Sequence, residues 1–471
     1  MREAPTIDRA VSADAAIESP AIRSAAARDG SGRAPPPSAA HFGLNMLALC
    51  GGLLALGAFY VGGRIDAGGV FAPLAASAAV AAIIVSGEML WLGTGFAPSS
   101  GLARQSLRPA RLGRVATRLL GLGLTLAAVA VLYWLFPEYH GDFYAPFWRF
   151  LGVSSAWPYL SLHGALWLLL APLYFLWADR HLVDPADAYW ELGALIRPGR
   201  WRQANWALLR AHAMGWGVKA FFLPLMVVYL DGNVRALGHA LRLLSGDGMR
   251  IYQLFFELSY TIDVLFCVVG YALTLRLFDS HIRSTEPTAF GWMVALICYQ
   301  PFYSVIGRNY LAYDDRIYWD NWLAPWPVLK FVWGAAIVAL LLIYALSTVA
   351  FGLRFSNLTH RGIITGGPYR FSKHPAYLAK NLSWWLISVP FISGQGWAQG
   401  LRDCALLGLV NLVYYLRART EERHLGRDPA YRAYALWIEE HGLLRGLARR
   451  LPFLRRRPPA RGGLTGEGET A

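Results

Sequence analysis

The chain has 471 residues, of which 55% are hydrophobic and only 16% are charged. Soluble domains carry about a quarter charged residues, so this composition excludes an ordinary soluble protein and indicates an all-α, polytopic membrane protein. The net charge of +14 does not indicate nucleic-acid binding, because the basic residues lie mostly in the loops between apolar segments and in the tail.

The sequence predicts four regions along the chain. Residues 1–41 are rich in Ala, Arg, Ser and Pro and lack the apolar core of a signal peptide, so we expect a disordered cytoplasmic extension. Residues 42–323 are expected to form N-terminal transmembrane helices, and residues 324–451 a transmembrane core. Residues 452–471 are expected to be a basic, disordered tail.

Ten apolar segments predict about ten transmembrane helices, since lipid offers backbone groups no hydrogen-bond partners outside a helix. A spanning helix needs about 20 residues, and some of the segments are shorter than this. The segments are Phe42–Val61, Gly69–Leu92, Leu119–Phe136, Tyr159–Trp177, Trp216–Leu230, Leu254–Leu277, Phe290–Ile306, Val328–Phe351, Tyr377–Ile392 and Ala405–Leu416.

Charge alternates between successive loops. Basic loops alternate with loops that are neutral or acidic. We expect the basic loops and both termini on the cytoplasmic side of a membrane. A bacterial-type inner membrane is the expected location. The basic loops hold Arg104, Arg108, Arg111, Arg114 and Arg118, then Arg197, Arg200 and Arg202, then Arg354, Arg361, Arg370 and Lys373.

Cysteine usage indicates neither a disulfide framework nor a metal site. The four cysteines lie in or beside apolar segments and have no paired ligand spacing, so we expect no bound metal. The cysteines are Cys50, Cys267, Cys298 and Cys404.

The stretch "GGPYRFSKHPAYLAKNLSWW" stands at the start of the ninth apolar segment. Its glycines and Pro368 predict a turn. Pro375 suits the first turn of a helix, which places His374 near the N-cap, where free N–H groups favour a carboxylate. A basic, aromatic helix start is also ordinary membrane anchoring, and that alternative stays open.

A second polar stretch, "RARTEERHLGRDPAYRAYALW", follows the last apolar segment. Glu421 and Glu422 are expected just beyond the membrane, where Arg417 could form an ordinary ion pair with Glu421. They lie 47 and 48 positions after His374, which is the spacing of a tight helical hairpin. The hairpin predicts that the histidine and the glutamates return to the same face.

The two stretches together resemble the isoprenylcysteine carboxyl methyltransferase family and its phospholipid methyltransferase relatives, over roughly Thr359 to Gly446. The resemblance implies a pocket for S-adenosylmethionine and catalytic roles for Lys373 and His374, although Lys373 stands where the family usually has Arg. Tyr431 and Tyr434 match the family's spaced tyrosines. The implied cofactor-binding residues are Tyr369, Arg370, His374, Pro375, Tyr377, Glu421 and Glu422.

The resemblance implies an integral membrane methyltransferase whose acceptor is a lipid-like molecule from the bilayer, such as an isoprenylcysteine carboxylate. A sterol-reductase-like oxidoreductase using NADPH is an alternative, although two glutamates repel a pyrophosphate. A second alternative is a transporter or lipid-binding protein, which would require Glu88, Glu257 and Asp263 to face a polar path.

Overall fold

The structure is a computed structural model, and it describes residues 34–63, 65, 70–151, 153–154, 157–160 and 162–450. The predicted extension at 1–41 lies outside the described residues up to position 33, and the predicted tail at 452–471 lies wholly outside them. The described chain is mostly helical, which confirms the predicted class.

The long helices carry most of the chain. They are α2 (Phe42–Val61), α3 (Phe71–Ser86, continued by the turns of Gly87–Leu92), α4 (Leu112–Leu135), α6 (Leu162–His181), α8 (Trp206–Arg242), α9 (Gly248–Ala272), α13 (Pro327–Phe351), α14 (Pro375–Ser388), α15 (Trp397–Leu425) and α16 (Pro429–His441). The shorter helices are α5 (Ala145–Leu151), α7 (Ala188–Ala194), α10 (Ala289–Leu296), α11 (Phe302–Tyr310), α12 (Trp319–Trp322) and α17 (Arg445–Arg450).

Two small antiparallel sheets complete the described structure. One pairs β1 (Val153–Ser154) with β2 (Trp157–Leu160), and the other pairs β3 (Ser284–Thr285) with β4 (Thr359–His360). The second sheet joins the chain before α10 to the chain after α13 and therefore lies beside the predicted core.

Six helices in the described part of the chain are long and apolar enough to cross a membrane, which indicates a membrane protein. Of the other predicted segments, one falls in α6, one is divided between α10 and α11, one forms the 14-residue α14, and one lies inside the 29-residue α15. The six are Phe42–Val61, Phe71–Leu92, Leu112–Leu135, Trp206–Arg242, Gly248–Ala272 and Pro327–Arg354.

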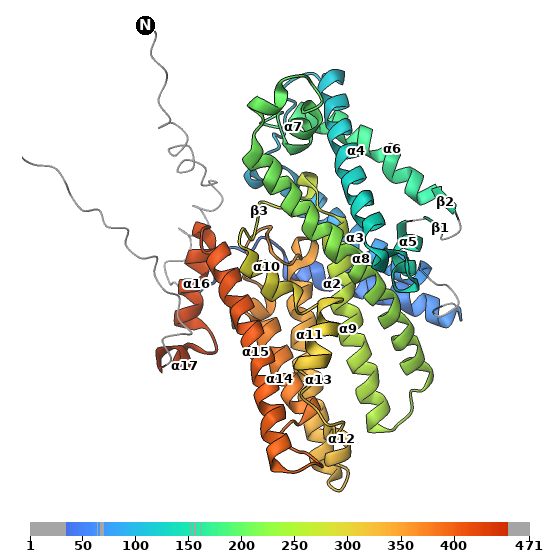
Figure 1. Cartoon of the computed structure of the whole chain (residues 1–471), viewed down its shortest axis with the longest axis vertical. Helices are drawn as coiled ribbons and strands as arrows, with labels where there is room; N and C mark the ends of the chain where they lie inside the picture. Colours follow the sequence, from blue (N-terminus) through green and yellow to red (C-terminus); the bar gives the residue numbers. More distant parts are fainter. Residues whose placement is uncertain are drawn as a thin grey trace, which may run out of the picture.

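Helix α13 stands between the two halves of the helical body. It packs on α9 on one side and on α14 on the other, and Figure 1 shows α13, α14 and α15 side by side with α16 beside the end of α15. Buried apolar side chains of α3, α8, α9 and α13, among them Val80, Leu225, Phe266 and Val349, form the main core.

The chain before α2 lies along the segment that leads to the Gly-Pro-Tyr-Arg turn. The Ala39 N–H donates to the Ile363 carbonyl at 2.8 Å, and the Thr365 hydroxyl donates to the Pro36 carbonyl at 2.6 Å. Gly367 has φ +58°, and a Cβ there would lie 2.7 Å from the Phe42 ring. Only glycine fits this position, so Phe42 at the start of α2 packs directly against the turn.

Helices α4 and α7 touch backbone to backbone through two glycines. A Cβ on Gly121 would lie 1.9 Å from the Tyr189 carbonyl oxygen, and one on Gly193 would lie 1.9 Å from the Thr117 carbonyl oxygen. Small residues allow such close approach between helices.

We therefore expect Gly121→Ala to lower the free energy of unfolding by about 1–3 kcal/mol or more, because the backbone cannot yield without separating the helices. Gly123→Ala is the matched control on the same helix, since nothing described lies within 4 Å of its added Cβ, and alanine favours a helix. Thermal unfolding in detergent measures both. Equal effects of the two substitutions would contradict this account of the α4–α7 contact.

Candidate functional site

The Gly-Pro-Tyr-Arg turn (Gly367–Arg370) is held from one side by α16. The Tyr434 hydroxyl donates to the Tyr369 carbonyl at 2.7 Å and lies 3.2 Å from the Ser372 carbonyl. Tyr431 is buried beside Tyr434, with ring centroids 6.1 Å apart. Tyr434 therefore fixes the shape of the turn, Tyr431 packs against Tyr434, and neither tyrosine lines either cavity described below.

Helix α14 begins at Pro375, directly after the turn, with His374 as its N-cap residue. This agrees with the sequence prediction, because proline lacks the N–H that a first helical turn leaves unpaired anyway. The same first turn leaves the N–H groups of Ala376 and Tyr377 without helical acceptors, and both residues line a cavity.

The two polar stretches meet at this helix start, as the hairpin predicted. The His374 Nε2 lies 3.1 Å from Glu422 Oε1, and the Tyr377 hydroxyl donates to Glu421 Oε2 at 2.9 Å. The imidazole and phenol rings are parallel, with centroids 5.5 Å apart. His374 and Tyr377, at the start of α14, therefore each contact one of the two glutamates of α15.

Glu422 is the centre of an ion-pair cluster. Its Oε1 lies 2.9 Å from Lys373 Nζ, and its Oε2 lies 2.7 Å from Arg419 Nη1. Burial opposes ionisation, but the hydrogen bond from His374 and the charges of His374 and Lys373 hold the pKa of Glu422 down at about 2. Both oxygens are committed to these partners, so Glu422 orients Lys373 and His374.

Glu421 has a different environment, although it is the next residue. It lines a cavity of about 280 Å³, together with Tyr369, His374 and Tyr377. Arg417 is not its ion-pair partner. The Arg417 guanidinium hydrogen-bonds the side-chain oxygen of Asn357 and lies 5.2 Å from the centroid of the Tyr377 ring.

This larger cavity reaches far beyond the two sequence stretches. Its walls come from α8, α9, the β3–α10 segment, α13, β4, α14 and α15, so the predicted N-terminal helices and the predicted core build it together. Sequence reasoning missed several of its polar residues: Asn233, Glu286, Tyr299, Tyr344, Asn357, Thr359, Lys380 and Arg417.

A polar cluster lies where the cavity borders the membrane helices. Asp263 on α9 accepts hydrogen bonds from the hydroxyls of Tyr344 and Thr348 on α13. Lys380 on α14 lies 3.5 Å from the Tyr344 hydroxyl and 4.8 Å from the centroid of its ring. Single charged residues within apolar segments are the sequence signal for such a cluster, because they are costly in lipid.

Only one of the three intramembrane carboxylates considered in the sequence lines this cavity. Asp263 does, whereas Glu88 is buried in an ion pair with Arg354 Nη1 at 2.5 Å, and Glu257 is bonded to the Gln253 side chain. The transporter alternative needs a continuous polar path that includes all three carboxylates. Glu88 and Glu257 do not line the cavity, so they do not contribute to such a path there.

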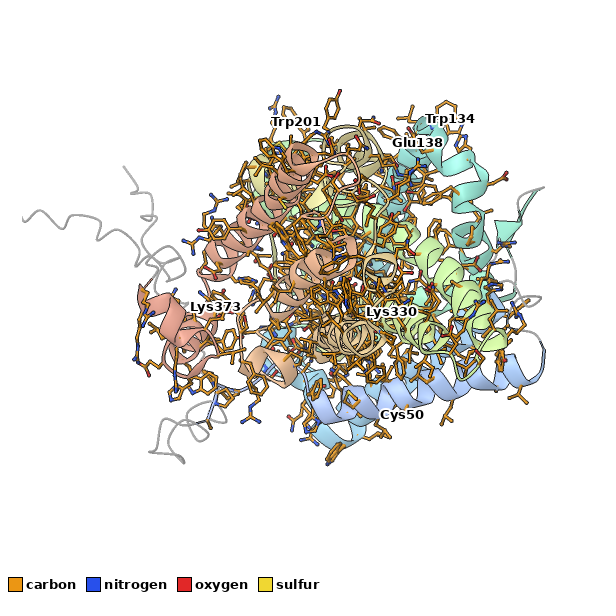
Figure 2. The ribbon with its side chains drawn as sticks, turned by 90° about the horizontal axis from the view of Figure 1, so that it is seen from below. Cys50, Trp134, Glu138, Trp201, Lys330 and Lys373 are labelled. Carbon is orange, nitrogen blue, oxygen red and sulfur yellow. The ribbon has the colours of Figure 1, made fainter. Side chains whose placement is uncertain are left out.

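A second cavity of about 250 Å³ lies on the other side of the helix start. His374, Tyr377 and Tyr414 line both cavities and thus form a shared wall. Lys373 and Glu422 line the second cavity only, and Figure 2 shows Lys373 at the edge of the molecule, far from Trp134 and Glu138.

Two of the predicted site residues line neither cavity. Arg370 is exposed, and Pro375 is buried in the first turn of α14, where its role is to start the helix. The other five predicted cofactor-binding residues and both predicted catalytic residues line at least one cavity.

The larger cavity carries charges of both signs. Asp263, Glu286 and Glu421 are acidic, while Lys380 and Arg417 are basic. Such a cavity suits a ligand that itself carries cationic and anionic groups, and its tyrosine rings offer faces to a cation. Comparison of the chain with protein-family models, curated proteins and solved structures found no match.

Proposed function

We propose that the chain is an integral membrane methyltransferase that uses S-adenosylmethionine and acts on a lipid-like acceptor. The observation that carries the proposal is the meeting of His374 and Tyr377, at the start of α14, with Glu422 and Glu421 on α15. These residues come from the two stretches that resemble the isoprenylcysteine carboxyl methyltransferase family.

The residues that line the larger cavity have the charges and hydrogen-bonding groups that S-adenosylmethionine requires. Glu421 and Glu286 can accept hydrogen bonds from its ammonium and hydroxyl groups, while Arg417 and Lys380 can hold its carboxylate. Buried oxygens of Glu286 and Thr359 lack hydrogen-bond donors among the described residues, as expected for atoms that serve a ligand. When bound, S-adenosylmethionine supplies a methyl group on a positively charged sulfur.

The protein contributes position above all. Holding two reactants in line can lower a barrier by roughly 7–11 kcal/mol. In its neutral form His374 can donate its Nε2–H to Glu422 and keep Nδ1 as an acceptor. An amine acceptor would give its proton to Nδ1, whereas a carboxylate acceptor is already ionised and needs no base.

The second cavity is the proposed place of the acceptor. Its wall includes Leu378, Ile438 and Leu444 beside the charged Lys373, which suits a molecule with an apolar chain and a polar head. His374, Tyr377 and Tyr414 line both cavities, so the methyl group would pass to the acceptor beside these side chains, where the two cavities adjoin.

The proposal includes a ten-span arrangement in a bacterial-type inner membrane, with both termini cytoplasmic. Helices α6, α10 with α11, α14 and α15 would add four crossings to the six apolar helices. The Arg asymmetry of the loops supports this orientation, under which Lys373 and His374 would lie on the cytoplasmic side.

Ligand-induced stabilisation tests the function directly. We expect S-adenosylmethionine to raise the thermal-unfolding midpoint of the detergent-purified protein, because a ligand at a hundredfold excess over its dissociation constant stabilises the native state by about 2.7 kcal/mol. NADPH at the same concentration is the matched comparison. A shift with NADPH and none with S-adenosylmethionine would overturn the proposal.

One observation favours the NADPH-dependent alternative. The Tyr344 hydroxyl lines the cavity between Asp263 and Lys380, where it could donate a proton to a reduced substrate. Three carboxylates line the same cavity, however, and they repel the phosphates of NADPH. Lys380 and Arg417 in the same cavity would attract those phosphates, so the comparison of the two ligands by measurement decides between the alternatives.

A further inference from the structure

Glu286 is a buried carboxylate that belongs to neither sequence stretch. It follows β3, and its N–H donates to the Leu358 carbonyl at 2.8 Å, beside β4. Only 2% of the residue is exposed. A Cβ on Gly291 would lie 2.4 Å from the Glu286 side chain, so a glycine at 291 leaves the room that the carboxylate occupies.

The two oxygens of Glu286 are not equivalent. Oε1 accepts hydrogen bonds from the Thr288 N–H, at 3.1 Å, and from the Thr288 hydroxyl, and it lies 3.5 Å from Arg423 Nη2. Oε2 is buried and has no donor among the described residues. A buried carboxylate oxygen without a donor is costly, so its missing partner requires an explanation.

The cavity offers that explanation. Glu286 lines it, and so does Thr359 on the paired strand, whose hydroxyl also lacks a partner in the described structure. Glu421 contributes a further carboxylate to the same cavity. Two carboxylates and a hydroxyl from three separate segments favour a ligand that presents N–H or O–H donors.

We propose that Glu286 is a ligand-binding residue whose Oε2 accepts a hydrogen bond from an ammonium or hydroxyl group of the molecule in the larger cavity. The inference rests on the proposed function, under which that molecule is S-adenosylmethionine. It gives the helices before the core a part in recognition, because β3 and α10 precede residue 324.

Glu286→Gln tests the proposal with little change of shape. The amide keeps an oxygen that can accept from Thr288, but an N–H₂ group replaces Oε2 and cannot accept from the ligand. We expect the affinity for S-adenosylmethionine, measured by calorimetry on the full-length protein in detergent, to fall at least 10-fold. The unfolding midpoint without ligand should stay close to that of the wild type.

Thr288→Ala is the matched control, because it removes the hydroxyl that bonds Oε1 and leaves Oε2 unchanged. It should alter stability more than affinity. Wild-type affinity in Glu286→Gln would overturn the inference and leave the proposed function standing. Equal losses of stability and affinity in both variants would also overturn it, because they indicate a structural role. Absence of binding to the wild-type protein would instead remove the proposed function itself.

Discussion

A His374→Ala protein is expected to bind S-adenosylmethionine about 10- to 100-fold more weakly than the wild type and to lose methyl transfer. His374 lines the larger cavity, and a hydrogen bond between its side chain and a charged group of the ligand would be worth about 1.5–3 kcal/mol. The imidazole also lies parallel to the Tyr377 ring. Its loss would remove the ring that stacks on Tyr377 and with it part of the wall that the two cavities share, while the Tyr377 hydroxyl keeps its bond to Glu421.

His441→Ala is the control for this experiment. His441 is exposed on α16, stacks on Trp437 and lines neither cavity, so its replacement should leave binding unchanged. Calorimetry gives the affinity, and the unfolding midpoint shows whether each variant is folded. Normal methyl transfer by a folded His374→Ala protein would mean that the start of α14 is only a membrane anchor.

The helical class could be predicted because the length of an apolar segment can be read directly from consecutive residues of the sequence. Two breaks within the predicted segments were missed, for a reason that the sequence also contained. The apolar run Tyr377–Ile392 continues past Ser388, but α14 ends there, and Val389 has φ +38° before Pro390. A residue before proline avoids the helical region. Pro301 similarly stands between α10 and α11.

The sequence could also have separated the two glutamates. Successive residues of an α-helix point about 100° apart, so neighbours do not share a partner. Glu421 accordingly faces Tyr377 and Glu422 faces Lys373 and His374.

The contribution of Glu286 to the larger cavity could not be predicted in this way, whereas Asp263 stood out in the sequence as a carboxylate within an apolar segment. Hydrophobic patterns show which residues are apolar, but they do not show which distant segments become neighbours. Glu286 lies 135 positions before Glu421, yet both line the same cavity.

Glu422 is a charged residue of the site that is expected to contribute to folding. It lies beyond the apolar part of α15, and its carboxylate contacts Lys373, His374 and Arg419. Its pKa is lowered from 4.5 to about 2. One pKa unit corresponds to about 1.4 kcal/mol, so the ionised carboxylate contributes about 3 kcal/mol to stability at neutral pH.

Glu422→Gln is therefore expected to lower the free energy of unfolding by about 3 kcal/mol at pH 7. Because the folded-state pKa is the lower one, this contribution is fully present above pH 4.5 and is lost as the pH falls through 4.5 towards 2. The difference between wild type and variant should shrink over the same range. Denaturant unfolding in detergent at a series of pH values measures it.

Glu440→Gln is the control, whereas Glu439 is unsuitable because its carboxylate lies 4.0 Å from Lys373 Nζ. Glu440 is exposed on α16 and lines neither cavity, so surface charge alone predicts a change of about 0–1 kcal/mol. A Glu422→Gln effect equal to that of Glu440→Gln would contradict the ion-pair cluster. A large effect that does not depend on pH would show that Glu422 acts through packing, because only an ionised carboxylate loses its partners on protonation.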